Sequence, residues 1–163
     1  MRTPRKKQAA LADARARRSA ARLAAVQAIY QHWTAATPVA RLLHEFHDHR
    51  LGAEIEDEQY LAADAAFFDD VVTGVLLRQD ELDMAIAERL AEGWTLGRLD
   101  RLMHAILAAG AYELVARADV PRGAVVNEYV EVARAFYPAS EAGFVNALLD
   151  RLGKAVRPEG VAA

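Results

Sequence analysis

The chain has 163 residues, a formal net charge of -3 and no cysteine. A domain of this size can bury enough apolar surface to fold without a metal or a disulfide. The lack of cysteine excludes disulfides, thiolate metal sites and cysteine nucleophiles. No stretch approaches the roughly 18 uncharged apolar residues of a membrane helix, and no apolar run follows the charged N-terminus as it would in a secretory signal. We therefore expect a cytoplasmic protein that makes no membrane contact.

The net charge hides an uneven distribution along the chain. Residues 1–22 contain eight Lys or Arg and one acid, Asp13, whereas the remainder has ten more acids than bases. Because attraction to phosphate is local, a basic arm on an acidic body can still bind nucleic acid.

The composition predicts an all-α fold, since Ala and straight-chain residues dominate and no strand-like alternation with turn signals occurs. We expect a disordered basic tail at 1–8 and a helical domain over 9–158. Its first helix covers about 9–33, because Leu23, Val26, Tyr30 and Trp33 recur with helical spacing. Thr37-Pro38 opens a second helix, and an acidic loop follows at 53–60.

A long third helix is expected over 62–90 and a fourth over about 96–116. The turn at 119–121 precedes a fifth helix, because the residue before a proline avoids the helical region. Tyr137-Pro138 ends that helix, and Ser140-Glu141 is a plausible cap for a sixth. The C-terminus at 159–163, with the residues just before it, is expected to fray.

Candidate catalytic and metal-binding residues are few. His44 and His47 share a helix face, but His49 points elsewhere, so a solvated face is favoured over a metal site. Neighbouring carboxylates such as Asp69-Asp70 diverge on a helix and cannot share a substrate. The sequence also has no phosphate-binding glycine loop, nucleophile elbow or His-Glu-x-x-His motif. We therefore expect no enzyme activity, no metal and no cofactor.

The basic arm is the strongest functional signal. Arg15, Arg18 and Arg22 line one face of the first helix, with Arg17 beside it and Tyr30 two turns beyond Arg22. Guanidinium groups in a row can follow phosphates, and a tyrosine ring can stack on a base. The alternative is a solubilising tail with Tyr30 packed in the core.

Two asparagines lie in apolar surroundings, Asn127 in AVVNEYVEVA and Asn146 in GFVNALLD. Because an unpaired buried amide is costly, we expect each to bond a backbone group at a helix junction and to fix packing.

Three segments carry a family resemblance: ARRSAARLAAVQAIYQ, GAYELVARADVPRGAVVNEYVEVARAF and GFVNALLDRL. In this order and spacing they resemble the NusB family of bacterial transcription antitermination factors, over about Arg15 to Pro158. The resemblance implies two small helical bundles packed into one globular domain. It also implies binding of single-stranded boxA RNA together with the ribosomal protein NusE, within the RNA polymerase antitermination complex, to promote transcription of ribosomal RNA operons. A homodimer that covers the RNA surface is possible in such a family.

The resemblance also implies site residues. The arginine-rich start would supply RNA contacts from Arg15, Arg17, Arg18, Arg22 and Tyr30, and a second segment would supply them from Ser140 and Phe144. Arg101 and His104 would lie on the NusE-facing helix. The chain departs from the family pattern at 19–21, where Ser-Ala-Ala replaces further arginines, and at Ala108 and Ser140.

Two other functions remain open at this stage. The same helical domain occurs fused ahead of RNA cytosine methyltransferases, although this chain has no room for a cofactor-binding domain. A helical interaction module that does not bind RNA is the other alternative.

Overall fold

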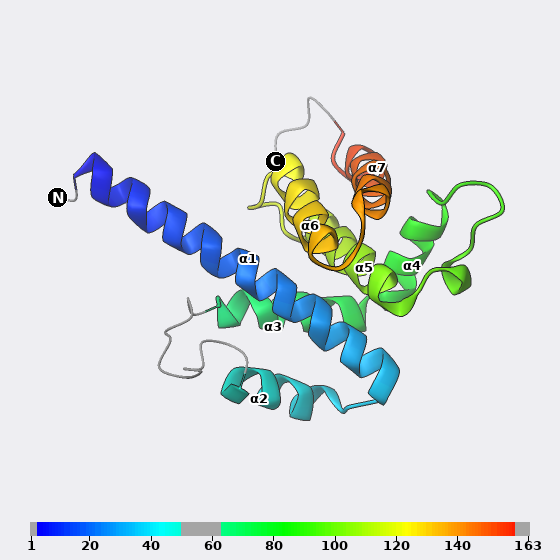
Figure 1. Cartoon of the computed structure of the whole chain (residues 1–163), viewed down its shortest axis with the longest axis horizontal. Helices are drawn as coiled ribbons and strands as arrows, with labels where there is room; N and C mark the ends of the chain where they lie inside the picture. Colours follow the sequence, from blue (N-terminus) through cyan, green and yellow to red (C-terminus); the bar gives the residue numbers. More distant parts are fainter. Residues whose placement is uncertain (1–2, 50–62, 159–163) are drawn as a thin grey trace.

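The computed structural model describes residues 3–49 and 63–158 and shows an all-helical fold, with no strand in those ranges. Figure 1 shows the helices in chain order. They are α1 (Pro4–Ala35), α2 (Val39–His49), α3 (Ala65–Leu77), α4 (Gln79–Ala87), the 3-10 helix η1 (Leu96–Arg98), α5 (Arg101–Ala116), α6 (Arg122–Phe136) and α7 (Ala139–Val156). The expected all-α class is confirmed, whereas the acidic loop expected at 53–60 lies outside the described residues.

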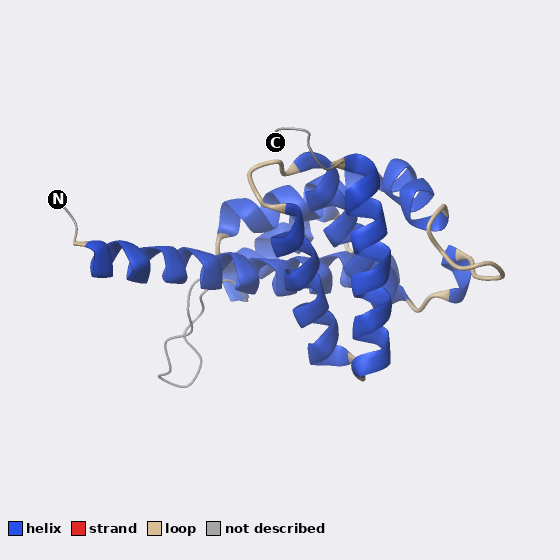
Figure 2. Ribbon diagram, turned by 90° about the horizontal axis from the view of Figure 1, so that it is seen from above, coloured by secondary structure: helices blue, strands red, loops and turns tan. Residues whose placement is uncertain are grey.

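Two helical groups pack against each other around a continuous apolar core. In the first group, α1 packs on α2 and α3. In the second, α5 packs on α6 and α7, and α4 lies against α5. Helix α1 also packs on α5, so it joins the two groups, and its N-terminal half projects beyond both of them (Figures 1 and 2). The expected pair of packed bundles is confirmed.

Helix α1 starts earlier than the sequence analysis predicts. The Thr3 hydroxyl accepts a hydrogen bond from the backbone N–H of Lys6, and Pro4 occupies the first turn. A threonine cap followed by proline is a strong start signal, because proline has no N–H to leave unpaired there. The prediction of a disordered tail is therefore wrong for residues 4–8, which are helical.

The long helix predicted over 62–90 is two helices. The backbone leaves helical geometry at Arg78, with φ -111° and ψ 21°, and α4 then runs in a new direction. The helix predicted over 96–116 is also divided, because the Asp100 side chain accepts from the N–H of Met103 and caps α5. Ser140 lies inside the first turn of α7, so it is not the cap that the sequence suggests.

Arg157 closes the second group of helices. Its guanidinium donates to the backbone carbonyls of Glu113, Leu114, Arg117 and Val120 at distances of 2.5–2.8 Å. The last carbonyls of a helix have no partner within that helix, so Arg157 caps the end of α5 from the end of α7. The expected fraying of the C-terminal residues does not extend to this position.

None of the described helices combines the length and the apolar character that crossing a bilayer requires.

Candidate nucleic-acid interface

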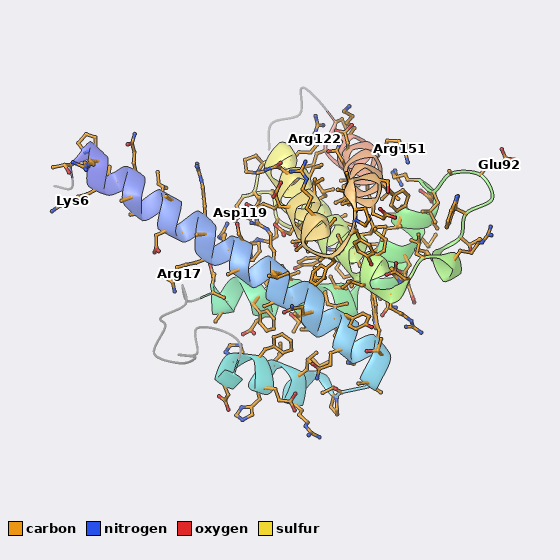
Figure 3. All side chains as sticks on the ribbon, in the orientation of Figure 1. Lys6, Arg17, Glu92, Asp119, Arg122 and Arg151 are labelled. Carbon is orange, nitrogen blue, oxygen red and sulfur yellow. The ribbon has the colours of Figure 1, made fainter. Side chains whose placement is uncertain are left out.

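The exposed part of the interface is the projecting half of α1. Arg5, Lys6, Lys7, Arg15 and Arg17 are all exposed on it. Figure 3 shows Lys6 at the far end of this arm, remote from the packed helices, and Arg17 closer to the body. The positive charges at the tip of the arm thus lie away from the packed helices, as phosphate binding requires.

Arg18 lies where the arm meets the body, and acidic side chains partly hold it there. Its side chain is 35% exposed and lies 3.7 Å from Asp64 and 3.4 Å from Asp119. The guanidinium carbon also lies 4.7 Å from the centroid of the Phe67 ring. Hydrogen bonds from Arg117 lower the pKa of Asp119, so that carboxylate is charged at neutral pH. Arg18 can therefore meet a phosphate only in competition with these acids.

Arg22 does not belong to the exposed face. Its side chain is 4% exposed and makes two hydrogen bonds of 2.8 and 3.0 Å to Glu113, which is fully buried. Glu128 lies 3.7 Å from the same guanidinium. The expectation that Arg22 contacts RNA is therefore wrong. At Arg22 the helix already packs against the body of the protein, so this arginine is a core residue although it shares a helix face with Arg15.

Tyr129 completes the buried group around Glu113, because its hydroxyl donates a short hydrogen bond to the same carboxylate. Burial, followed by the negative charge of Glu113, raises the pKa of Tyr129 well above its usual value. The tyrosine therefore stays protonated and keeps donating. Ser19, one turn before Arg22, donates to Glu128 at 2.8 Å. This network ties α1 to α5 and α6 and fixes the rotation of the arm about its own axis.

Tyr30 is exposed, which rules out the alternative that packs it in the core. Its exposed fraction is 41%, and Trp33, three residues further along α1, lies against His104 of α5 with 4.5 Å between the ring centroids. Burial and then a 2.5 Å hydrogen bond to Asp100 raise the pKa of Tyr137. Tyr137 and Asp100 therefore lie together at the start of α5, and Tyr30 lies on the part of α1 that packs against this helix.

Ser140 and Phe144 both lie on α7. Both line a pocket of about 390 Å³ that also includes Asp100. Ser140 is exposed, and its hydroxyl donates to Glu141 at 2.5 Å. Phe144 is partly buried and packs against the core. The structure thus brings Ser140 and Phe144 together with Asp100 at one pocket, although Asp100 lies about 40 residues earlier in the chain.

The two residues predicted to face a protein partner have different environments. Arg101 is exposed at the start of α5. His104 has a side chain only 14% exposed, 2.7 Å from Asp83 of α4, and its ring centroid lies 4.5 Å from that of Trp33. Arg101 is accessible to a partner, whereas His104 holds α1, α4 and α5 together.

The expectation for the two asparagines is wrong. Asn127 and Asn146 are exposed, and both line a groove of about 650 Å³ between α6 and α7. Their apolar neighbours along the sequence face the core, whereas the asparagines themselves are exposed. Apolar neighbours in the sequence were therefore not evidence that the amides are buried.

His44 and His47 of α2 each pair with a different carboxylate. His44 lies 3.0 Å from Asp48, and His47 lies 2.6 Å from Asp69 of α3. Across the described residues no group of three potential metal ligands occurs, and the side chain of His49 lies outside them.

One aromatic residue that lines the pocket of Ser140 and Phe144, Trp94, was not predicted from the sequence. Trp94 is 53% exposed and lies in the loop between α4 and η1, with the Arg98 guanidinium 5.4 Å from its ring centroid. A tryptophan placed directly after the helix-ending Glu92-Gly93 pair was the available signal, because large aromatic residues in polar loops are uncommon without a contact to make.

Comparisons with known proteins agree over most of the chain. The profile of the NusB family matches residues 19–154. A "Transcription antitermination protein NusB" of Sphingopyxis alaskensis is 68% identical over 140 residues, which is 86% of this chain and 94% of that relative. The protein of the same name from Novosphingobium aromaticivorans is 62% identical over 140 residues, covering 86% of this chain and 95% of the relative.

Solved structures show the same fold. The T. maritima NusB structure superposes with a TM-score of 0.72 at 25% identity and covers 87% of this chain and 94% of that one. A structure of the antitermination factors NusB and NusE in complex with dsRNA has a TM-score of 0.70 at 19% identity and covers 85% and 97%. With the profile match and these relatives together, the chain belongs to the NusB family.

Proposed function

We propose that this chain is a transcription antitermination factor that binds single-stranded boxA RNA together with the ribosomal protein NusE. In this role it joins the antitermination complex of RNA polymerase in the cytoplasm and promotes processive transcription of ribosomal RNA operons. It binds and positions these partners and catalyses no reaction. The relatives that are named for transcription antitermination support the role, and a solved relative with NusE and RNA supports the partners.

The exposed basic arm is the observation that carries the RNA part of the proposal. Arg15 and Arg17 are exposed on α1, whose N-terminal end projects beyond the packed helices. Arg18 joins them when phosphates displace Asp64 and Asp119. From Arg15 to Tyr30 the helix covers about 22 Å, at roughly 1.5 Å per residue. Phosphates would thus run along the arm, and bases would reach the face of Tyr30, Ser140 and Phe144.

Accessible charge at the start of α5 supports the protein-binding part. Arg101 is exposed in the first turn of α5, next to the capping residue Asp100, so a partner docked there would adjoin the proposed RNA face. This position would let RNA and NusE touch each other as well as this chain, which explains joint binding by shared contacts.

The RNA proposal is tested by measuring affinity for boxA RNA as salt is raised. Neutralising one phosphate of a single strand contributes a slope of about -0.7 to the plot of log K against log salt. With Arg22 buried, the three remaining arginines give about -2, rather than the roughly -3 that four would give. Arg15→Ala should weaken binding and reduce the slope by about 0.7.

Arg134→Ala is the matched control, because Arg134 is an exposed arginine that pairs with Glu131 on α6, away from the arm. It should leave both affinity and slope unchanged. Measurements at several protein concentrations also detect a homodimer that covers the arm, since such a dimer would lower the apparent affinity as concentration rises. An affinity that does not respond to salt would refute the electrostatic role of the arm.

A further inference from the structure

The pocket beside Phe144 has a shape and chemistry that the arm does not explain. Besides Ser140 and Phe144, its walls are mainly apolar and comprise Ala91, Trp94, Arg98, Leu99, Asp100, Met103 and Glu141. Its volume of about 390 Å³ falls at the lower end of the roughly 300–1,000 Å³ typical of small-ligand sites. A cavity of this size suits one flat ring better than a folded segment of protein.

We propose that this pocket takes one unpaired base of the bound RNA, stacked against Trp94. The inference rests on the proposed function and extends it, because it adds Trp94, at the end of the molecule opposite the arm, to the base-binding face of Ser140 and Phe144. Figure 3 shows this separation: Lys6 marks the tip of the arm, and Glu92 marks the loop that carries Trp94.

The aromatic wall is held ready for stacking. Gly93 has φ +86°, a left-handed conformation that glycine adopts without strain, and it turns the loop at this point. Arg98 donates to the Gly93 carbonyl at 2.8 Å and lies against the Trp94 ring. The indole is therefore supported on one side by a cation and is more than half exposed, as a base-stacking platform needs to be.

The charges around the pocket favour a base over a phosphate. Asp100 and Glu141 both line it, and two carboxylates would repel a phosphate group. Carboxylates accept hydrogen bonds from the amino and imino groups on base edges. Leu99, Met103 and Phe144 supply the apolar surface for the ring itself.

Continuity with the proposed RNA face gives the base a route to the pocket. Trp33, three residues after Tyr30, lies against His104 of α5. Tyr137 donates to Asp100 at the start of the same helix, and Asp100 lines the pocket. An RNA strand that follows α1 to Tyr30 would thus pass Ser140 and Phe144 and end at Trp94.

The test measures boxA RNA binding to the full chain with Trp94→Ala, Trp94→Phe and Leu77→Ala variants. Leu77 is the matched control, since it is an apolar side chain 85% exposed at the end of α3. Trp94→Ala should weaken binding about 5- to 140-fold, the equivalent of ~1–3 kcal/mol for one stacked base. Trp94→Phe should retain most of the affinity, and Leu77→Ala all of it. Melting curves should be unchanged for each variant, because both side chains are exposed.

Two readouts separate stacking from a structural effect. RNA should quench the Trp94 fluorescence, obtained as the difference between the wild-type chain and Trp94→Phe. RNAs with a single abasic nucleotide, moved along the strand, should show one position at which the abasic change and Trp94→Ala are not additive.

Several results would overturn the base pocket while leaving the proposed function intact. One is salt-dependent RNA binding with no quenching and no loss in Trp94→Ala. Another is a loss seen only when NusE is present, which would assign the pocket to the protein partner. A wild-type chain that binds no RNA would instead overturn the proposed function and the pocket together.

Discussion

Arg22→Ala separates a structural role for this arginine from a role in RNA binding. The substitution removes both hydrogen bonds to Glu113 and leaves a carboxylate with no exposed surface beside Tyr129 alone. Removing one partner of a buried pair costs about 3–5 kcal/mol, a large share of the roughly 5–15 kcal/mol that stabilises a typical domain.

For a chain of this length, 1 kcal/mol changes the melting temperature by about 2–4 °C. Arg22→Ala should therefore lower it by about 6–20 °C in thermal melts followed by circular dichroism. Arg15→Ala, on the exposed arm, should change it by less than about 2 °C, since exposed substitutions contribute little.

A paired substitution supplies the control for RNA binding. Arg22→Met with Glu113→Gln removes both charges, keeps an acceptor for the Tyr129 hydroxyl and should restore much of the lost stability. We expect this double variant to bind boxA RNA with the wild-type salt slope. If Arg22→Ala melts like the wild type and loses RNA affinity instead, then Arg22 contacts RNA and the argument from burial is wrong.

Three further predictions follow from the packing and charges. Gly74→Ala should lose about 1–3 kcal/mol of stability in denaturant titrations, because a Cβ there would lie 2.2 Å from the Tyr112 ring. Gly97→Ala is the control and should keep the wild-type stability, because its Cβ would meet only one atom, at 4.0 Å. Burial and a hydrogen bond to Asp70 raise the pKa of Tyr112 to about 12. The protonated tyrosine therefore contributes its full stabilisation below about pH 10 and loses it as the pH rises to about 12. This loss should be absent from the pH profile of stability of Tyr112→Phe. Asp119→Asn should strengthen RNA binding a few-fold at low salt by releasing Arg18, and unchanged affinity would show that this acid does not compete.

The sequence predicted most of the helices and the turns between them. Apolar spacing located the body of α1, and the prolines at 38, 121 and 138 marked helix boundaries correctly to within a few residues. The start of α1 was missed although the same Thr-Pro pair was recognised at 37–38. No glycine or proline stands at the break at Arg78, and the apolar spacing continues across it. The sequence therefore predicted one long helix where the structure has α3 and α4.

The candidate site was less predictable, because its residues depend on how helices pack. Helical spacing grouped Arg22 with Arg15, yet burial by α5 and α6 places them in opposite environments. The sequence indicated only that Asp69 and Asp70 diverge on a helix, whereas in the structure Asp70 accepts from Tyr112. Asp83 likewise pairs with His104, which no sequence pattern indicated. A local sequence window holds only one partner of each of these contacts, since they join residues 21–91 positions apart.

The Arg157 clamp has a consequence for how the molecule opens. Its four bonds reach back 37–44 residues along the chain, so none of them forms until the end of α7 lies against the end of α5. Helices α5, α6 and α7 should then exchange their backbone hydrogens as one cooperative unit, at a rate set by complete unfolding. The first turns of α1 project beyond the packed helices, and their hydrogens should exchange by local fraying while the rest of the fold stays closed.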